Sequence, residues 1–288
     1  MRMTGLQTLA EIRLNREGAL AGEIDAVHAM RVSIRRLRSV VSAAKPILAP
    51  RQYRWSSVQL KWLGDILGSA RNWDVFTTEL LNPLLKIMPA DHDLAPLAVA
   101  AERERKAAYR KMHEWLRSER YAATTAALEC WFDTGGWLLG LTWPRDLPFS
   151  SPLHELIPAL LERRRRRVRK LSRNFVTLSD DERHQLRIAL KKLRYVIELF
   201  GDIFDQDDVS TYLQLLKPPQ AILGFSNDVR IASGLIQHLS SADGHPLSNA
   251  VTRAEGFLLG WHERGLAEQD VLLRRHIERI RRAKPFWR

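Results

Sequence analysis

Residues 28–38 read HAMRVSIRRLR, and residues 184–194 read HQLRIALKKLR. The same offset of 156 residues relates further positions along the chain: Leu60 and Leu216, Lys61 and Lys217, Gly68 and Gly224, and Asn72 and Asp228. An offset held without a gap over such a stretch is typical of a duplicated structural unit. We therefore predict two copies of one helical unit, an N-terminal bundle over residues 1–145 and a C-terminal bundle over residues 150–288.

Apolar side chains in both copies recur every three or four residues, as on the buried face of an amphipathic helix. In the first copy these are Val27, Met30, Ile34, Leu37 and Val41, and in the second they are Leu186, Leu190, Leu193 and Ile197. No stretch of the chain shows a sustained alternation of period two with β-branched residues. We predict an all-α fold in which two pseudo-symmetric helical bundles surround a basic central surface.

Glycine, proline and the helical periodicity set the expected boundaries. Residues 179–182 have the spacing of a capping box, and Asp25 is a candidate N-cap. A turn-rich connector is expected at 133–152. The predicted helices cover 5–21, 25–44, 52–67, 72–81, 94–117, 118–132, 153–175, 180–200, 209–223, 227–240, 246–260 and 266–283.

The chain of 288 residues is strongly basic, with 45 Lys and Arg against 33 Asp and Glu and a net charge of +12. Both halves share this excess, which favours a polyanionic partner such as nucleic acid, polyphosphate or anionic lipid. The alternative is a basic surface that serves only solubility. Cys130 is the single cysteine, and no apolar run approaches 18 residues. From these features we expect a soluble, cytoplasmic protein.

A second, polar stripe follows each apolar face, displaced by one residue and therefore about 100° around the helix. It comprises His28, Arg31, Arg35 and Arg38 in the first copy and His184, Arg187, Lys191 and Arg194 in the second, with Arg36 and Lys192 beside them. No acidic residue lies between residues 26 and 64 or between 183 and 197. The counter-charges must therefore come from other helices, from solvent ions or from a bound anion.

Other cations could extend this surface, and we include Lys61, Arg110, Arg166, Lys170, Lys217 and Arg282 as candidates. Arg166 belongs to five consecutive arginines, which must point all round a helix, so two or three of them at most can face one site. The stripe histidines could donate a hydrogen bond, gain a charge, accept a phosphoryl group or bind a metal. Neither has a second metal-binding side chain at i+3 or i+4, and a structural role for them stays open.

With the duplicated stripe in view, the chain resembles the CHAD domains (conserved histidine α-helical domains) over nearly its whole length. The resemblance includes the Leu-Gly-x-x-Arg-Asn-x-Asp turn ending at Asp74, the segment from Leu223 to Asp228, and the ending at Lys284-Pro-Phe-Trp287. It departs from the family at Asn72, where an Asp is common, and at Pro218-Pro219. Two prolines there are expected to end or kink the helix, which puts Lys217 in doubt as a site residue.

The resemblance implies a single domain, residues 1–288, that binds inorganic polyphosphate on its basic central surface, without a cofactor. It also implies association with polyphosphate granules. The binding candidates carried over by position are His28, Arg31, Arg35, Arg36, Arg38, His184, Arg187, Lys191, Lys192 and Arg194.

Two other functions remain as alternatives. Non-specific binding of DNA or RNA backbones needs no motif beyond the cations, although Tyr195 is the one aromatic residue beside the stripes for base stacking. A phosphoanhydride hydrolase would require carboxylates that hold Mg²⁺. Glu102-Arg-Glu104-Arg-Lys106 matches a triphosphatase motif, but it lies in a helical pattern instead of a strand. Asp205, Asp207 and Asp208 form the nearest acidic cluster, in an expected loop. We therefore predict a binding protein and not an enzyme.

Overall fold

The computed structural model describes residues 1–89, 93–140, 153–242 and 249–288, and every regular element in these ranges is helical. This confirms the all-α prediction. The helices of the first half are α1 (Arg2–Leu14), α2 (Arg16–Leu20), α3 (Ile24–Ala44), α4 (Pro50–Asp74), the π-helical turn η1 (Val75–Leu81), α5 (Asn82–Leu85), α6 (Leu94–Arg117), α7 (Glu119–Asp133) and the 3-10 turn η2 (Gly136–Leu138). Those of the second half are α8 (Leu153–Leu171), η3 (Phe175–Thr177), α9 (Asp180–Phe200), η4 (Gly201–Ile203), α10 (Gln206–Ala242) and α11 (Asn249–Arg282).

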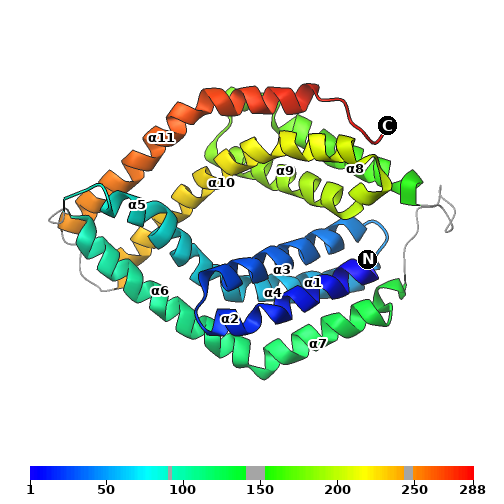
Figure 1. Cartoon of the computed structure of the whole chain (residues 1–288), viewed down its shortest axis with the longest axis horizontal. Coiled ribbons are helices and arrows are strands. Elements are labelled where there is room, and N and C mark those ends of the chain that lie inside the picture. The colour runs from blue at the N-terminus through cyan, green and yellow to red at the C-terminus, as the bar shows by residue number, and fades with distance from the viewer. Residues whose placement is uncertain (90–92, 141–152, 243–248) are drawn as a thin grey trace.

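The two halves of the chain form two groups of helices on either side of the middle of the molecule. In Figure 1 the first half occupies the lower part and the second half the upper part, with α3 and α9 toward the centre. These two helices carry the quoted stretches, and they are in contact with each other. The fold therefore brings the two polar stripes to the boundary between the halves.

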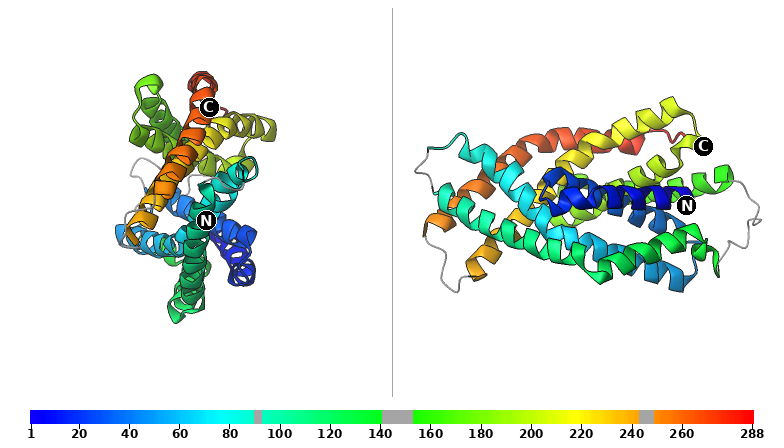
Figure 2. Two further views of the ribbon diagram at one scale, coloured as in Figure 1. Left: turned by 90° about the vertical axis from the view of Figure 1, so that its left-hand side faces the viewer. Right: turned by 60° about the horizontal axis from the view of Figure 1, so that its bottom comes forward.

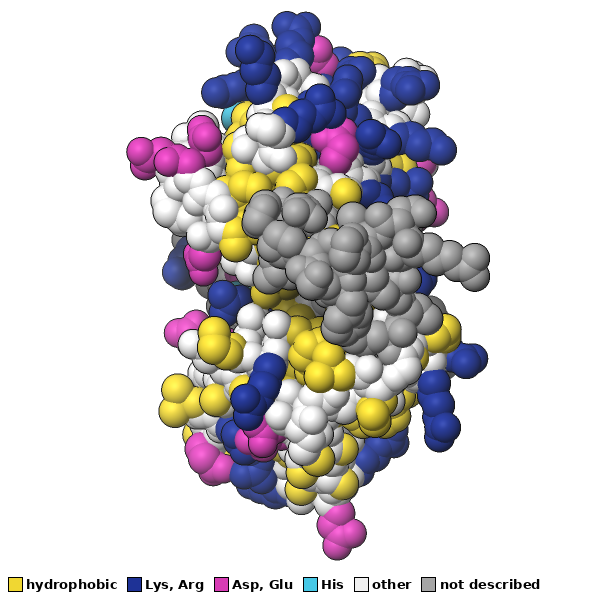
Figure 3. All heavy atoms as spheres, turned by 90° about the vertical axis from the view of Figure 1, so that its right-hand side faces the viewer, with side chains coloured by type: hydrophobic (Ala, Val, Ile, Leu, Met, Phe, Trp, Pro, Cys, Tyr) yellow, Lys and Arg dark blue, Asp and Glu magenta, His cyan; other side chains and the backbone are white. Residues whose placement is uncertain are grey.

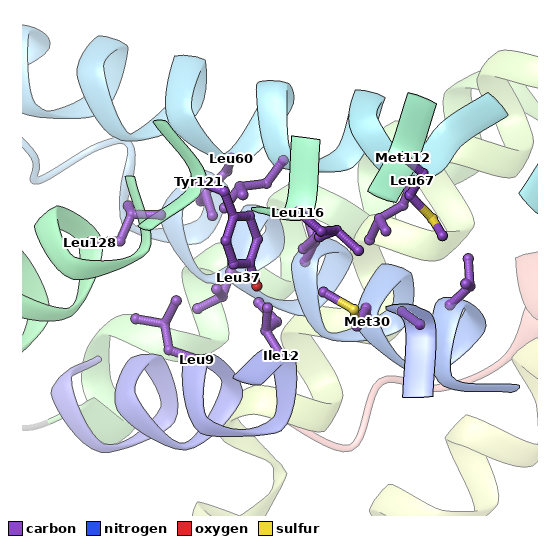
Figure 4. Close-up of a cluster of buried hydrophobic side chains, with 14 of the residues drawn as sticks. Leu9, Ile12, Met30, Leu37, Leu60, Leu67, Met112, Leu116, Tyr121 and Leu128 are labelled. Atoms are coloured by element: carbon purple, nitrogen blue, oxygen red, sulfur yellow. The ribbon is translucent and has the colours of Figure 1, made fainter. Parts of the chain in front are cut away.

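The core of the first half is built on the apolar face predicted for α3. Val27, Met30, Ile34 and Leu37 are all at most 2% exposed. Figure 4 shows how side chains from α1, α4, α6 and α7 close around Met30 and Leu37. In the second half the predicted face of α9 is equally buried, within a core that includes parts of α8, α10 and α11.

A third core joins the two halves at one end of the molecule. It combines Trp73, Phe76 and Leu97 from the first half with Ile236 and Leu258 from the second. Figure 2 shows α5 and α6 crossing α10 and α11 at this end. The two halves of the chain are thus held together by shared apolar burial. The origin of the two halves by duplication stays a prediction.

Several predicted helix boundaries are wrong. The prolines at 218 and 219 do not end a helix, because α10 continues through both of them to Ala242. Pro219 is buried, and α10 packs against both α9 and α11, so tertiary contacts compensate for the lost backbone hydrogen bonds. The predicted break between Gly260 and residue 266 is also absent, because α11 runs without interruption from Asn249 to Arg282.

Other boundaries follow local chemistry. The expected first helix divides at Asn15, whose side-chain amide donates to the Glu11 carbonyl at 2.8 Å and competes with the backbone. Helix α3 begins at Ile24, so Asp25 lies in the first turn instead of at the N-cap. The capping box of Ser179 and Glu182 is confirmed. The predicted helix start at Pro246 and residues 141–152 of the predicted connector lie outside the described residues.

We expect Gly5→Ala to lower the free energy of unfolding by about 1–3 kcal/mol, although alanine is the better helix former. A Cβ at Gly5 would overlap the ring of Phe132, which is fully buried. Gly234 in α10 is the matched control, because a Cβ there meets nothing within 4 Å. Gly234→Ala should raise the free energy of unfolding by about 0.5–1 kcal/mol. Urea denaturation of both variants measures the two changes, and equal signs would contradict this account of Gly5.

Candidate functional site

A cavity of about 770 Å³ lies between α3 and α9 and is completed by residues of α4 and α10. Among the described residues that line it are eight lysines and arginines, two histidines and one carboxylate, Asp228. The cations are Arg31, Arg35, Arg38, Arg71, Arg187, Lys191, Lys192 and Arg230. Positively charged side chains gathered in a partly enclosed space produce a strong positive potential that attracts anions.

Helix α4 positions the arginines of α3. The Nη1 atom of Arg31 donates to the Gly64 carbonyl oxygen at 3.4 Å. A Cβ at Gly68 would stand 3.3 Å from the same Nη1 atom, and one at Gly64 would stand 3.7 Å from Nη1 of Arg38. The absence of side chains at Gly64 and Gly68 therefore leaves room for both guanidinium groups between α3 and α4.

Helix α10 orients the histidine of α9. His184 Nδ1 lies 2.8 Å from Oδ1 of Asn227, which is 8% exposed. Because the amide oxygen can only accept, Nδ1 donates this hydrogen bond. His28 on α3 has a different setting. Burial, followed by the charges of Arg71 and Arg35, lowers its pKa. The two stripe histidines are therefore not equivalent.

Several cavity cations have no carboxylate within ion-pair distance in the part of the chain that the structure describes: Arg35, Arg187 and Lys191. The Nε atoms of Arg35 and Arg187 are also buried without a hydrogen-bond partner there. Burying charge without a partner costs free energy. Burial among like charges therefore lowers the pKa of several cavity cations. Burial, then Arg35 and Arg71, lowers the pKa of Arg31 to about 10. Burial, then Arg187 and Arg35, lowers the pKa of Lys191 to about 7.

We expect anion affinity to fall as the pH rises above about 7, because Lys191 is then neutral in the free protein. A bound anion favours the charged amine, so binding above this pH takes up a proton, and the loss approaches about tenfold per pH unit for one proton. Below pH 7 this group is already charged and contributes no pH dependence. Lys191→Arg should flatten the profile on the alkaline side. Titration over a pH series measures both, and an identical slope in the variant would contradict the assignment to Lys191.

Eight of the sequence-predicted site residues line the cavity: His28, Arg31, Arg35, Arg38, His184, Arg187, Lys191 and Lys192. The other eight do not line it. Five of these are engaged by carboxylates, namely Arg36 by Glu11, Lys61 by Asp65, Arg166 by Glu162, Arg194 by Glu198 and Arg282 by Glu278. The remaining three are exposed on outer surfaces: Arg110, Lys170 and Lys217.

Helix geometry explains why Arg36 and Arg194 lie outside. Arg36 follows Arg35 by one position and therefore points about 100° away, toward Glu11 on α1 at 3.4 Å. Arg194 has Glu198 at i+4, only 2.6 Å away, just beyond the acid-free interval of the sequence. The prediction that the stripes lack local counter-charges is thus wrong for Arg194.

Four cavity residues outside the proposed stripes are Tyr53, Arg71, Asn227 and Arg230. Arg71 and Asn227 lie in segments that carried the family resemblance, and each stands about three helical turns after Leu60 or Leu216, a shared spacing that could have suggested them. Arg230 and Tyr53 belong to no stripe. Their place in the cavity depends on how α10 and α4 cross α9 and α3, which sequence periodicity does not give.

The acidic motifs have structural surroundings of their own. Glu102 and Glu104 lie within α6, where Glu102 binds Arg105 at 2.7 Å, so the triphosphatase-like pattern is helical as predicted. Asp205 accepts hydrogen bonds from the amides of Asp207 and Asp208 at the start of α10. Within the described ranges, no three His, Cys, Asp or Glu side chains are placed to share a metal ion, and no helix is long and apolar enough to span a bilayer.

Known proteins share this fold. The structure is similar to the CHAD domain from the plant Ricinus communis, with a TM-score of 0.78, 24% sequence identity, and coverage of 94% of this chain and 88% of that one. It is also similar to PptA from Streptomyces chartreusis, with a TM-score of 0.70, 16% identity and 96% of each chain covered.

Among curated sequences, the uncharacterized protein Rv2226 of Mycobacterium tuberculosis is 27% identical over 235 residues. This match covers 77% of the present chain but 42% of the relative, so the chain spans less than half the length of the curated relatives it matches. The sequence profile of the CHAD domain matches residues 6–237, which is most of the chain. With two His/Arg/Lys stripes meeting across one cationic cavity in this fold, the protein belongs to the CHAD domain family.

Proposed function

We propose that the protein binds inorganic polyphosphate in the cavity between α3 and α9. The observation that carries this proposal is the lining of the cavity, which includes eight lysines and arginines and, among the described lining residues, a single carboxylate, Asp228. The CHAD family is associated with polyphosphate. We further propose that this binding brings the protein to polyphosphate granules in the cytoplasm.

The chemistry of the lining suits a phosphate polymer. Guanidinium groups stay charged and present planar donor pairs to phosphate oxygens. Binding of a flexible polyanion releases its condensed counterions, and each added cation contact contributes to this gain. Arg35 is central in this respect, because its charge acts on both Arg187 and Lys191 across the cavity. A phosphate chain between α3 and α9 would relieve the repulsion among these three groups.

The aromatic side chains of the cavity favour polyphosphate over single-stranded nucleic acid. Proteins that bind single strands stack bases on exposed aromatic rings. Tyr53 and Tyr195 line the cavity, but Lys45 Nζ lies 5.1 Å from the ring centre of Tyr53, and the Arg194 guanidinium lies 6.0 Å from that of Tyr195. A cation thus already lies over one face of each ring, in a position that a stacked base would need.

The test is a competition experiment. The protein is titrated with long-chain polyphosphate, single-stranded DNA and duplex DNA at equal phosphate concentration and at two salt concentrations. The proposal expects polyphosphate to bind most tightly at both salt concentrations. If the three polymers bind equally and weaken in parallel with salt, the protein is a general polyanion binder and the proposal fails.

A further inference from the structure

The two ends of the cavity differ in charge. At one end Asp228 lines the wall, where burial raises the pKa of its carboxyl, and nearby Glu79 pairs with the cavity cation Arg71 at 2.6 Å. An adjoining pocket shares His184, Asn227 and Arg230 with the cavity, and its other lining residues include three acids, Asp180, Glu263 and Asp270. Asp270 is paired with Arg183 and Arg274, so a polyanion that left the cavity in this direction would meet the exposed carboxylates of Asp180 and Glu263.

The opposite end is surrounded by cations. Lys192 and Arg38 line the cavity there. Three further cations, Lys45, Arg164 and Arg167, lie close enough to Lys192 to lower its pKa, after the larger effect of burial. We call these three residues the exit track. Figure 3 shows Lys and Arg side chains on both halves of the molecule, on the face that lies to the right in Figure 1.

Two contacts fix the exit track to the cavity wall. Nη2 of Arg164 donates to the backbone and side-chain oxygens of Ser42 at 3.1 and 3.2 Å, and Ser42 lines the cavity. Lys45 lies over Tyr53, which also lines it. The track is therefore continuous with the cavity and not a separate basic patch.

The arginine run on α8 divides according to its neighbours. Arg165 is buried and donates to the Ala283 carbonyl at 2.9 Å, and Arg166 pairs with Glu162 at 3.3 Å. Glu162 also lies near Arg165 and Arg288. Arg164 and Arg167, in contrast, lie near Lys192. Glu162 thus offsets part of the charge on the far side of α8, whereas Arg164 and Arg167 have no such carboxylate beside them in the described residues.

We propose that a long polyphosphate chain leaves the cavity at one end only, over Lys45, Arg164 and Arg167, so that the site selects long chains over short ones. This inference rests on the proposed function. Tripolyphosphate would be held by the cavity alone, whereas a long chain gains the additional contacts of the exit track. Selection by length then needs no recognition of a chain end, because the extra affinity comes from counterion release along the track.

The test is the double variant Lys45→Glu/Arg167→Glu, in which both altered side chains are exposed and the Arg164 contacts to Ser42 stay intact. The affinity for long-chain polyphosphate should fall about tenfold, as for two exposed charge contacts. The slope of log K against log salt should decrease by about 1.4 in magnitude, at about 0.7 per phosphate contact. The affinity for tripolyphosphate should stay unchanged.

The matched control is Lys111→Glu/Arg117→Glu, which makes the same change in net charge at exposed positions of α6, away from the cavity. It should leave both ligands nearly unaffected. The inference is overturned if the two double variants lose equal affinity for long chains. It is also overturned if Lys45→Glu/Arg167→Glu weakens tripolyphosphate binding as much as long-chain binding, or if this variant weakens the binding of neither ligand. Failure of the proposed function is distinguishable, since the unaltered protein would then show no preference for polyphosphate over DNA.

Discussion

Reversing the charge of Arg35 and Lys191 together is expected to weaken polyphosphate binding at least about a hundredfold. Each side chain supplies a charged contact worth about 1.5–3 kcal/mol, and the new carboxylates repel the ligand in a partly buried space. Arg35 and Lys191 lie on α3 and α9, on opposite walls of the cavity, so the variant alters both walls at once. Titration with long-chain polyphosphate at fixed salt and pH measures the change.

The control for this variant is Arg110→Glu/Lys217→Glu. These two cations were candidates from the sequence, but they are exposed and do not line the cavity. The same change in net charge at these positions should alter the affinity by less than about threefold, since solvent and salt screen exposed charges. Equal losses in the two variants would show that the net charge of the protein, and not the cavity, determines binding.

Replacing Asp74 with alanine is expected to lower the free energy of unfolding by about 3 kcal/mol. The Asp74 carboxylate is completely buried at the end of α4. It accepts hydrogen bonds from the Tyr109 hydroxyl at 2.9 Å and from Nη1 of Arg105 at 3.3 Å, both on α6. Alanine would leave a buried hydroxyl and a partly buried guanidinium without this partner. Urea denaturation measures the loss.

The Asp74→Asn variant removes the negative charge but keeps one oxygen that can accept a hydrogen bond. The amide oxygen can still accept from Tyr109, so a loss of about 1 kcal/mol is expected, well below that of Asp74→Ala. Asp74 stands one turn after Arg71, which lines the cavity and pairs with Glu79 at 2.6 Å. Equal destabilisation by alanine and asparagine would contradict the hydrogen-bond account.

Most of the fold could be predicted from the sequence, because helix formation and burial depend on local spacing. The apolar residues predicted for α3 and α9 are buried without exception. The continuous helix through Pro218 and Pro219 could not be predicted, since its compensation comes from packing of α10 against distant helices. The third core, which joins Phe76 to Ile236, likewise depends on the crossing of helices far apart in the chain.

The site was predicted in part for the same physical reason. A stripe on one helix is visible in the sequence, and the inward positions on α3 and α9 follow from it. Which cations are paired with a carboxylate depends on residues that the fold brings near them from other parts of the chain. Arg36 meets Glu11 from α1, and Arg166 meets Glu162, whereas Arg35 and Arg187 meet no carboxylate in the described residues. The sequence contains these acids but does not show which arginine each one reaches.

The most direct measurement is a crystal structure of the protein with tripolyphosphate bound. The account predicts phosphate groups between α3 and α9, with oxygens in contact with Arg35, Arg187 and Lys191. Phosphate bound only on outer surfaces, such as the basic end of α11 around Arg279 and Arg282, with no density in the cavity, would contradict it.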